Sequence, residues 1–77
     1  MVIKRYEDIN YDIIVSEEIY NHFRNDAEHM AIVYGDNGKA AIKHDIERAY
    51  FRFKNLGRKP EQELEIVART LIFEEMF

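Results

Sequence analysis

The last segment of the chain has apolar residues at helical spacing behind a recognisable helix start. Pro60 suits the first position of a helix, because the N–H that it lacks would have no partner there. Glu61 and Glu63 follow, and the positive end of the helix dipole stabilises their charges. The apolar residues that then recur on one face are Leu64, Val67, Ala68 and Leu71. This pattern predicts a helix over about 60–76 with that face toward a core.

The middle of the chain shows a longer pattern of the same kind. The residues that share one helical face are Ile42, Ile46, Ala49, Tyr50, Phe53 and Leu56. A strand could not bury this set on one side, because its side chains alternate between two faces. Asp36 or Asn37 can cap the start, and Gly57 suits the left-handed conformation that commonly ends a helix. We therefore expect a helix over about 39–56.

A further helix is expected to begin after Ser16, whose hydroxyl can accept a hydrogen bond from a free backbone N–H. Glu17 and Glu18 suit the positive end of this helix, and Val15 can pack against Tyr20 across its start. The apolar face continues through Ile19, Phe23, Met30 and Tyr34. These signals predict a helix over about 17–34.

The expected fold class is all-α, a small three- to four-helix bundle. The alternative is an α+β fold with a β-hairpin at about 31–43, because the glycine-bearing turn at 35–38 lies between two short apolar runs. Ala40 and Ala41 favour helix over strand at this point. Residues 1–15 are left open between a helix, a strand and an extended arm across the bundle. The residues that would share a helical face there are Val2, Tyr6, Ile9 and Ile13.

Length and composition restrict the class of protein. The chain has 77 residues, of which 47% are hydrophobic and 34% charged, so we expect one small globular domain. It has no cysteine, which excludes disulfides, cysteine-ligated zinc and thiol chemistry. No apolar run approaches the ~20 residues that span a membrane, so we expect a cytoplasmic protein without a membrane partner. A core of this size supplies only about 3–5 kcal/mol of net stability, which favours association with a partner.

Charge is unevenly distributed along the chain, although its net value is only −4. Residues 1–38 carry three basic and eight acidic side chains, whereas residues 39–59 carry seven basic and two acidic ones. Residues 60–77 are again acidic, with one basic and five acidic side chains. The middle helix either pairs with its acidic neighbours within the chain or offers its charge to phosphate or an acidic partner. The candidate contacts are Lys43, Arg48, Arg52 and Lys54.

Several apolar residues have no place in the core when each helix is turned by about 100° per residue. On the last helix, Ile66, Phe73 and Phe77 share a face opposite the one that begins at Leu64, and on the middle helix Phe51 points away from the core face. A chain this small has few elements with which to cover two faces of one helix. The residues expected to bind a partner are Ile66, Phe73, Phe77 and Phe51. In the alternative, the N-terminal arm covers them, with Val2, Ile3, Tyr6 or Ile13 as the lid.

Residues suited to catalysis or to metal binding are sparse. Ser16 is the only serine and Thr70 the only threonine, which leaves little for nucleophilic catalysis. The residues that could line one face of the first helix at the spacing of metal ligands are Glu18, His22, Asp26 and His29. Metal sites between helices need ligands from a facing helix, and no second motif of this type occurs, so a solvated polar face explains these residues. The two glycine-bearing breaks, at 35–38 and 57–60, match neither a phosphate-binding nor a dinucleotide-binding motif. We therefore expect no catalytic residue, metal or cofactor.

These features predict a small non-enzymatic regulatory protein that binds a protein partner and self-associates through its C-terminal helix. Arg48 and Arg52 would add charge complementarity at the rim of that contact. By analogy alone, an inhibitor or modulator of phage or mobile-element type fits this description. The alternative is a nucleic-acid-binding protein that uses residues 39–59, although the acidic last helix makes a poor recognition helix near phosphates.

Overall fold

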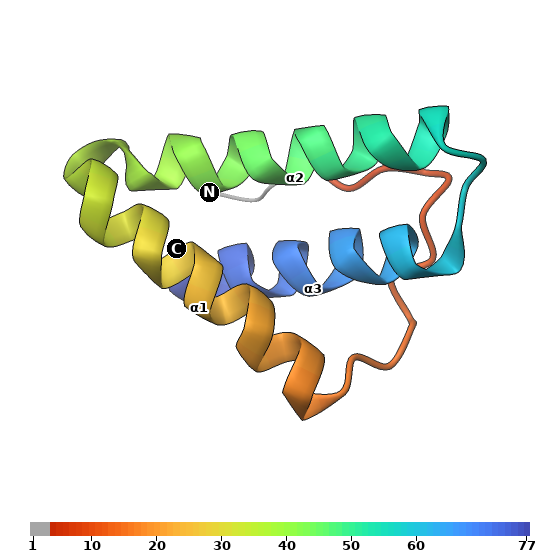
Figure 1. Ribbon diagram of the computed structural model, residues 1–77, viewed down its shortest axis with the longest axis horizontal. Helices are drawn as coiled ribbons and strands as arrows, with labels where there is room; N and C mark the ends of the chain where they lie inside the picture. The colour runs from red at the N-terminus through yellow and green to blue at the C-terminus, as the bar shows by residue number, and fades with distance from the viewer. Residues whose placement is uncertain (1–3) are drawn as a thin grey trace.

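The computed structural model describes residues 4–77, whose regular secondary structure is entirely helical (Figure 1). Helix α1 spans Glu17–Tyr34, a 3-10 turn η1 spans Gly35–Asn37, helix α2 spans Gly38–Asn55 and helix α3 spans Pro60–Met76. The helices predicted over about 17–34, 39–56 and 60–76 agree with these bounds to within one residue. The alternative β-hairpin at 31–43 is wrong, because these residues belong to α1, η1 and α2 and no strand occurs within 4–77.

Local signals explain where α1 begins and how it meets α2. The backbone N–H of Ile19 donates to Oγ of Ser16 at 3.3 Å, which is the cap expected from the sequence. Gly35 ends α1 with a φ of +54°, a conformation that glycine adopts without steric cost. Gly38 is buried at the start of α2, and a Cβ there would lie 2.8 Å from Cα of Ala31. The backbones of α1 and α2 therefore meet at a distance that only glycine allows.

The two ends of α2 are stabilised mainly by backbone groups. Asn37 occupies the cap position, but its side chain makes no capping hydrogen bond, so the expected side-chain cap is wrong in this detail. At the other end, the N–H of Leu56 donates to the carbonyl of Arg52 at 2.8 Å, and the N–H of Arg58 donates to that of Phe53 at 2.9 Å. The left-handed stop predicted at Gly57 is present, with a φ of +86°.

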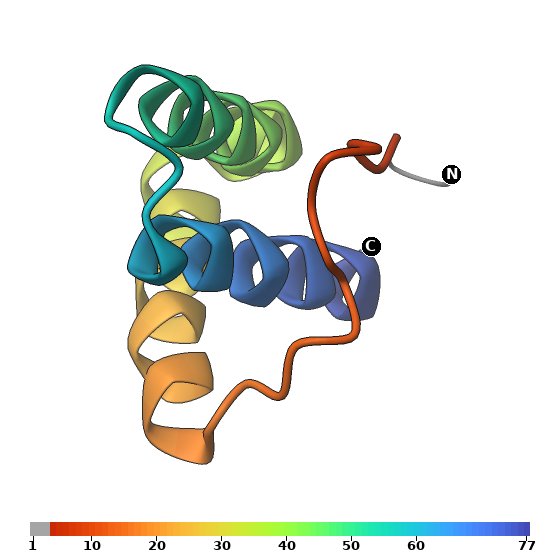
Figure 2. The same cartoon turned by 90° about the vertical axis from the view of Figure 1, so that its right-hand side faces the viewer.

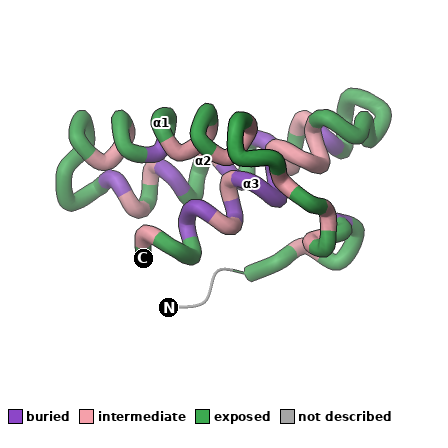
Figure 3. The backbone as a smooth tube through the Cα atoms, turned by 90° about the horizontal axis from the view of Figure 1, so that it is seen from below, coloured by how far each residue is buried: buried purple, intermediate pink, exposed green. Residues whose placement is uncertain are grey.

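Helix α3 is the central element of the fold. Both α1 and α2 pack against it, and the N-terminal segment crosses its remaining side (Figure 2). Its buried residues are Ile66, Val67, Ala68, Thr70, Ile72 and Phe73. They occupy several faces of α3, and the other two helices bury mainly one face each (Figure 3). Most of the apolar burial of the chain is therefore organised around this one helix.

The N-terminal segment, residues 4–15, is irregular, with turns at 7–8 and at 11–12. Its side chains alternate along most of its length: Ile9 is buried, and Tyr11, Ile13 and Val15 are half-buried. The residues between them are exposed, including Ile14 at 91%. The inward residues pack on a cluster formed by Ile9, Ala49, Phe53, Ile66 and Val67. Among the possibilities left open for residues 1–15, the described part is therefore an arm across the helices, and Val2 and Ile3 lie outside the described residues.

Polar contacts fasten the same segment to α2 and α3. Arg5 Nη2 donates to Glu74 Oε1 at 2.6 Å, which joins the segment to the end of α3. Asp8 accepts hydrogen bonds from the hydroxyl of Tyr50 at 2.7 Å and from Arg58 Nη1 at 2.8 Å. The hydrogen bond from Tyr50, supported by the one from Arg58, lowers the pKa of Asp8 below its ordinary value of 3.8. The same bond raises the pKa of Tyr50, because its phenol donates to a carboxylate.

The expectation that Ile66 and Phe73 lack a place in the core is wrong. Ile66 is 0% exposed and Phe73 is 2% exposed. Phe73 lies in a cluster with Ala27, Ile42, Ile46 and Ile72, which brings together all three helices. Ile66 packs with Phe53 of α2 and with Ile9 of the N-terminal segment. The alternative in which the arm acts as a lid is therefore correct for Tyr6 and Ile13, which pack against this core.

Candidate functional site

The side of α2 that faces away from the core forms the most distinctive exposed surface. Its members, here called the α2 outer face, are Lys43, His44, Glu47, Arg48, Phe51 and Lys54, and all are exposed. The opposite side of the helix carries Ile42, Ile46, Ala49 and Phe53, which are buried. The helical period thus places the basic residues predicted from the sequence on the solvent side, together with one aromatic ring.

Phe51 is one of the residues that line a shallow hollow on this face. The ring is 69% exposed and has no role in either core cluster. The hollow has a volume of about 420 Å³ and is lined by Glu47, Arg48, Phe51 and Arg52. The structure therefore places Phe51 beside Arg48 and Arg52, the two arginines that the sequence assigned to the rim of the same contact.

The cations around Phe51 differ in whether the chain itself neutralises them. Arg52 Nη2 donates to Glu65 Oε2 at 2.8 Å, and the same carboxylate accepts from Arg69 Nε at 2.9 Å. Within residues 4–77, Arg48 takes part in no ion pair, and neither do Lys43 and Lys54. The Nζ of Lys54 lies 5.5 Å from the ring centroid of Tyr50, a cation–π contact that leaves its charge near the surface. Ion pairs within the chain thus neutralise Arg52 but not the other three predicted contact residues, Lys43, Arg48 and Lys54.

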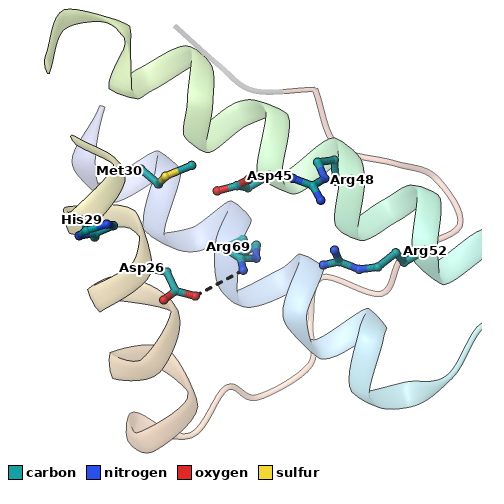
Figure 4. Close-up of a pocket in the computed structure, with 7 residues that line it drawn as sticks. All are labelled: Asp26, His29, Met30, Asp45, Arg48, Arg52 and Arg69. Carbon is teal, nitrogen blue, oxygen red and sulfur yellow. Dashed lines mark ion pairs between the residues drawn. The ribbon is translucent and has the colours of Figure 1, made fainter. Parts of the chain in front are cut away.

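A polar cleft adjoins the hollow and is shown in Figure 4. Its volume is about 250 Å³, and its lining comes from all three helices: Asp26, His29, Met30, Asp45, Arg48, Arg52 and Arg69. Arg69 Nη2 lies 3.6 Å from Asp26 Oδ2, and Arg52 extends from α2 toward Arg69 (Figure 4). Arg52 pairs with Glu65, and Arg69 pairs with both Glu65 and Asp26, so Arg48 is the one arginine of this cleft without an ion pair within residues 4–77.

The remaining predicted residues lie elsewhere. Phe77 is 44% exposed at the end of α3, where the Nζ of Lys39 lies 5.6 Å from its ring centroid. Lys43 lines a hollow near the start of α2 together with Asp36, Lys39 and part of Phe73. Lys43 is eight residues from Phe51, which is about 12 Å along a helix. The predicted aliphatic and aromatic surface is therefore divided, with Phe51 and Phe77 exposed at different places and Ile66 and Phe73 inside.

The polar residues of α1 do not assemble into a metal site. Asp26 is drawn toward Arg69, and the ring of His22 lies edge-on against Phe23 with the centroids 5.0 Å apart. In the part of the chain that the structure describes, no group of three or more histidine, aspartate or glutamate side chains is arranged to hold a metal ion. The polar face of α1 is accounted for by solvent, by an ion pair and by aromatic packing.

A further concavity, which the sequence had not indicated, lies between the N-terminal parts of α1 and α3. This α1–α3 groove has a volume of about 390 Å³ and is lined by Glu18, Ile19, His22, Phe23, Glu61 and Leu64. Ile19, Phe23 and Leu64 are each only half-buried. Sequence periodicity placed all three on inward faces, and it could not show that the two helices separate here and leave those residues partly uncovered.

Comparison of the chain with family models, with curated proteins and with solved structures gave no match. Across residues 4–77, none of the helices combines the length and the apolarity that crossing a bilayer requires.

Proposed function

We propose that this protein acts without catalysis, by binding an acidic surface of a partner protein through the α2 outer face. The observation that supports the proposal best is the position of Phe51, an aromatic ring 69% exposed in a hollow beside Arg48 and Arg52. Exposing such a ring to water is unfavourable, and aromatic and arginine side chains are the residues that dominate the energy of protein interfaces. A regulator or inhibitor that works by occupying its target needs no more than such a surface.

The charges around the ring determine the kind of partner. Arg48 and Lys54 carry positive charge that no ion pair within residues 4–77 offsets, whereas Glu47 contributes one negative charge nearby. A partner that places carboxylates around an apolar pocket would neutralise these cations and bury the ring of Phe51 in one contact. Because Arg52 already pairs with Glu65, we assign it a smaller share in binding than Arg48.

The test is capture of partner proteins from the native host on the immobilised chain. Wild type is compared with Phe51→Asp and with Ile32→Asp, since Ile32 is 81% exposed on α1 and lies outside the α2 outer face. Circular dichroism first checks that all three proteins keep the same helix content. Wild type and Ile32→Asp should retain the same acidic partner, which salt releases, and Phe51→Asp should lose it. Retention of the same proteins by Phe51→Asp would contradict the proposal.

Nucleic acid is a second candidate for the same face. The observation in its favour is that Lys43, Arg48 and Lys54 lie along one exposed side of α2. A nucleic-acid complex would weaken steeply with salt, and Arg48→Ala combined with Arg52→Ala would reduce its affinity for DNA or RNA of every sequence. Absence of binding to either at low salt would remove this candidate. The net charge of −4 makes it the weaker of the two, because acids elsewhere on a small surface repel phosphates.

A further inference from the structure

The α1–α3 groove has the composition of a docking site. Its walls are the half-buried side chains of Ile19, Phe23 and Leu64, and its rim carries Glu18, His22 and Glu61. Figure 1 shows the starts of α1 and α3 diverging, and the three apolar residues at this place are only half-buried. The result is a hollow of about 390 Å³ that is apolar inside and acidic at its edge.

The acidic rim is not neutralised by the chain itself. Neither Glu18 nor Glu61 takes part in an ion pair among the residues that the structure describes. Glu17 and Glu63 lie at the same two helix starts but do not line the groove, and Glu63 accepts a hydrogen bond from the backbone N–H of Asn10. The positive ends of the two helix dipoles offset part of this charge, but the carboxylates of Glu18 and Glu61 remain at the edge of the groove. An occupant with an apolar side chain between cations would complement it.

The chain presents such a feature on its own α2 outer face. Phe51 is the exposed ring, and Arg48 and Lys54, one helical turn before and after it, are exposed cations of the same face. We propose that the α1–α3 groove of one molecule binds Phe51 of a second copy, with the basic residues of α2 beside Glu18 and Glu61. This inference rests on the proposed function, because it uses the same face and names a second copy as its partner.

The contact joins two different surfaces, so it is a head-to-tail contact rather than one patch facing itself. In a pair joined by a single contact, one copy keeps a free groove and the other keeps a free Phe51. Two copies that exchange both contacts make a closed pair, and unreciprocated contacts make longer chains at higher concentration. In either case α3 contributes its first turn, through Glu61 and Leu64, while Ile66 and Phe73 remain inside.

Sedimentation of the full chain over a range of concentrations tests the contact. The variants are Phe51→Asp, which removes the ring, and Glu18→Lys combined with Glu61→Lys, which reverses the rim. Ile32→Asp is the control, since Ile32 is exposed outside both surfaces. Wild type and Ile32→Asp should associate. Phe51→Asp and the double glutamate variant should each associate at least about tenfold more weakly than wild type. Because each defective variant retains the surface that the other lacks, an equimolar mixture of the two should form a one-to-one complex.

The outcomes separate this inference from the proposed function. A wild-type chain that remains monomeric, or a Phe51→Asp chain that associates as wild type does, overturns the self-contact. A mixture of the two variants that associates no more strongly than either variant alone, while wild type associates, also overturns it, because the one groove and the one Phe51 that the mixture retains then do not bind each other. If the chain is monomeric but still retains an acidic host protein in a Phe51-dependent manner, the proposed function stands and the self-contact fails. If the chain associates as described and retains no host protein, the self-contact stands and the proposed function fails.

Discussion

The ring of Tyr6 lies face to face with the ring of Tyr50, with centroids 3.7 Å apart and planes 5° from parallel. This stack joins the N-terminal segment to α2 just beside the hydrogen bond from the hydroxyl of Tyr50 to Asp8. One aromatic residue of α2 thus gives the irregular segment both a flat apolar surface and a hydrogen-bond donor.

Replacing Tyr6 with alanine should therefore release much of the N-terminal segment. Tyr6 is half-buried and packs against both core clusters, so we expect Tyr6→Ala to lower the free energy of unfolding by about 2 kcal/mol. Urea unfolding followed by circular dichroism measures this change. Tyr34→Ala is the matched control, because Tyr34 is exposed at the end of α1 and its loss should cost about 0.5 kcal/mol or less. Equal effects of the two substitutions would contradict the role given to the stack.

The close approach of α1 and α2 leads to a second prediction. A Cβ at position 38 would lie 2.8 Å from Cα of Ala31, a backbone atom that cannot move away without separating the helices. Gly38→Ala should reduce stability by about 1–3 kcal/mol, even though alanine favours helix. Gly57→Ala is the comparison: nothing lies within 4 Å there, and only the φ of +86° opposes it, at a cost of about 1 kcal/mol. Thermal unfolding of both variants decides whether close approach outweighs backbone strain.

The carboxylate of Glu65 should contribute more to stability than an ordinary ion pair between residues four apart on a helix. Glu65 and Arg69 are only 16% and 14% exposed at their side chains, and Glu65 also accepts from Arg52. Glu65→Ala leaves Arg69 partly buried beside one weaker partner, Asp26 at 3.6 Å, so we expect a loss of about 1–3 kcal/mol. Glu28→Ala removes a pair of the same spacing with Arg24 at the surface and should cost at most about 0.5 kcal/mol. Chemical denaturation distinguishes the two, and similar losses would show that burial is unimportant here.

Acid should weaken the attachment of the N-terminal segment through Asp8. The folded chain holds the pKa of Asp8 below 3.8, so its contribution to stability is present above that pH and is lost as the pH falls through the lowered pKa. NMR titration of the Asp8 side chain should show a midpoint below 3.8. Because the hydrogen bond from Tyr50 is the largest cause, Tyr50→Phe should raise the midpoint more than Arg58→Ala does. A larger effect of Arg58→Ala would mean that charge, rather than this hydrogen bond, sets the pKa.

The sequence predicted the helices well because their signals are local. Ser16 caps α1, Pro60 opens α3, and Gly57 follows α2, and each of these effects depends on only a few neighbouring residues. The exposed position of Phe51 was also predictable, since its angle on α2 places it opposite a long buried face. These are properties of single helices and need no knowledge of how the helices pack.

What the sequence did not predict depends on contacts between distant segments. The second apolar face of α3 looked exposed because a helical projection does not show that α1, α2 and an irregular arm together surround this helix. A signal for the arm was present: Ile9, Tyr11, Ile13 and Val15 alternate with more exposed residues, which is the period of an extended chain rather than of a helix. The helical interpretation of Ile9 and Ile13 concealed that alternation. The α1–α3 groove could not be predicted either, because it depends on the divergence of two helices.

The central position of α3 also has a consequence for the order of folding. Helices α1 and α2 are neighbours in the chain and can meet as soon as both have been synthesised. The surface that receives Tyr6 and Ile9 is complete only once α3 has been added, more than 50 residues later, as the separations of the Arg5–Glu74 and Asn10–Glu63 contacts show. Contacts between residues so far apart in sequence form slowly, since a long loop must close first. During translation, the leading segment must therefore wait unattached while the helices that will hold it are still being made.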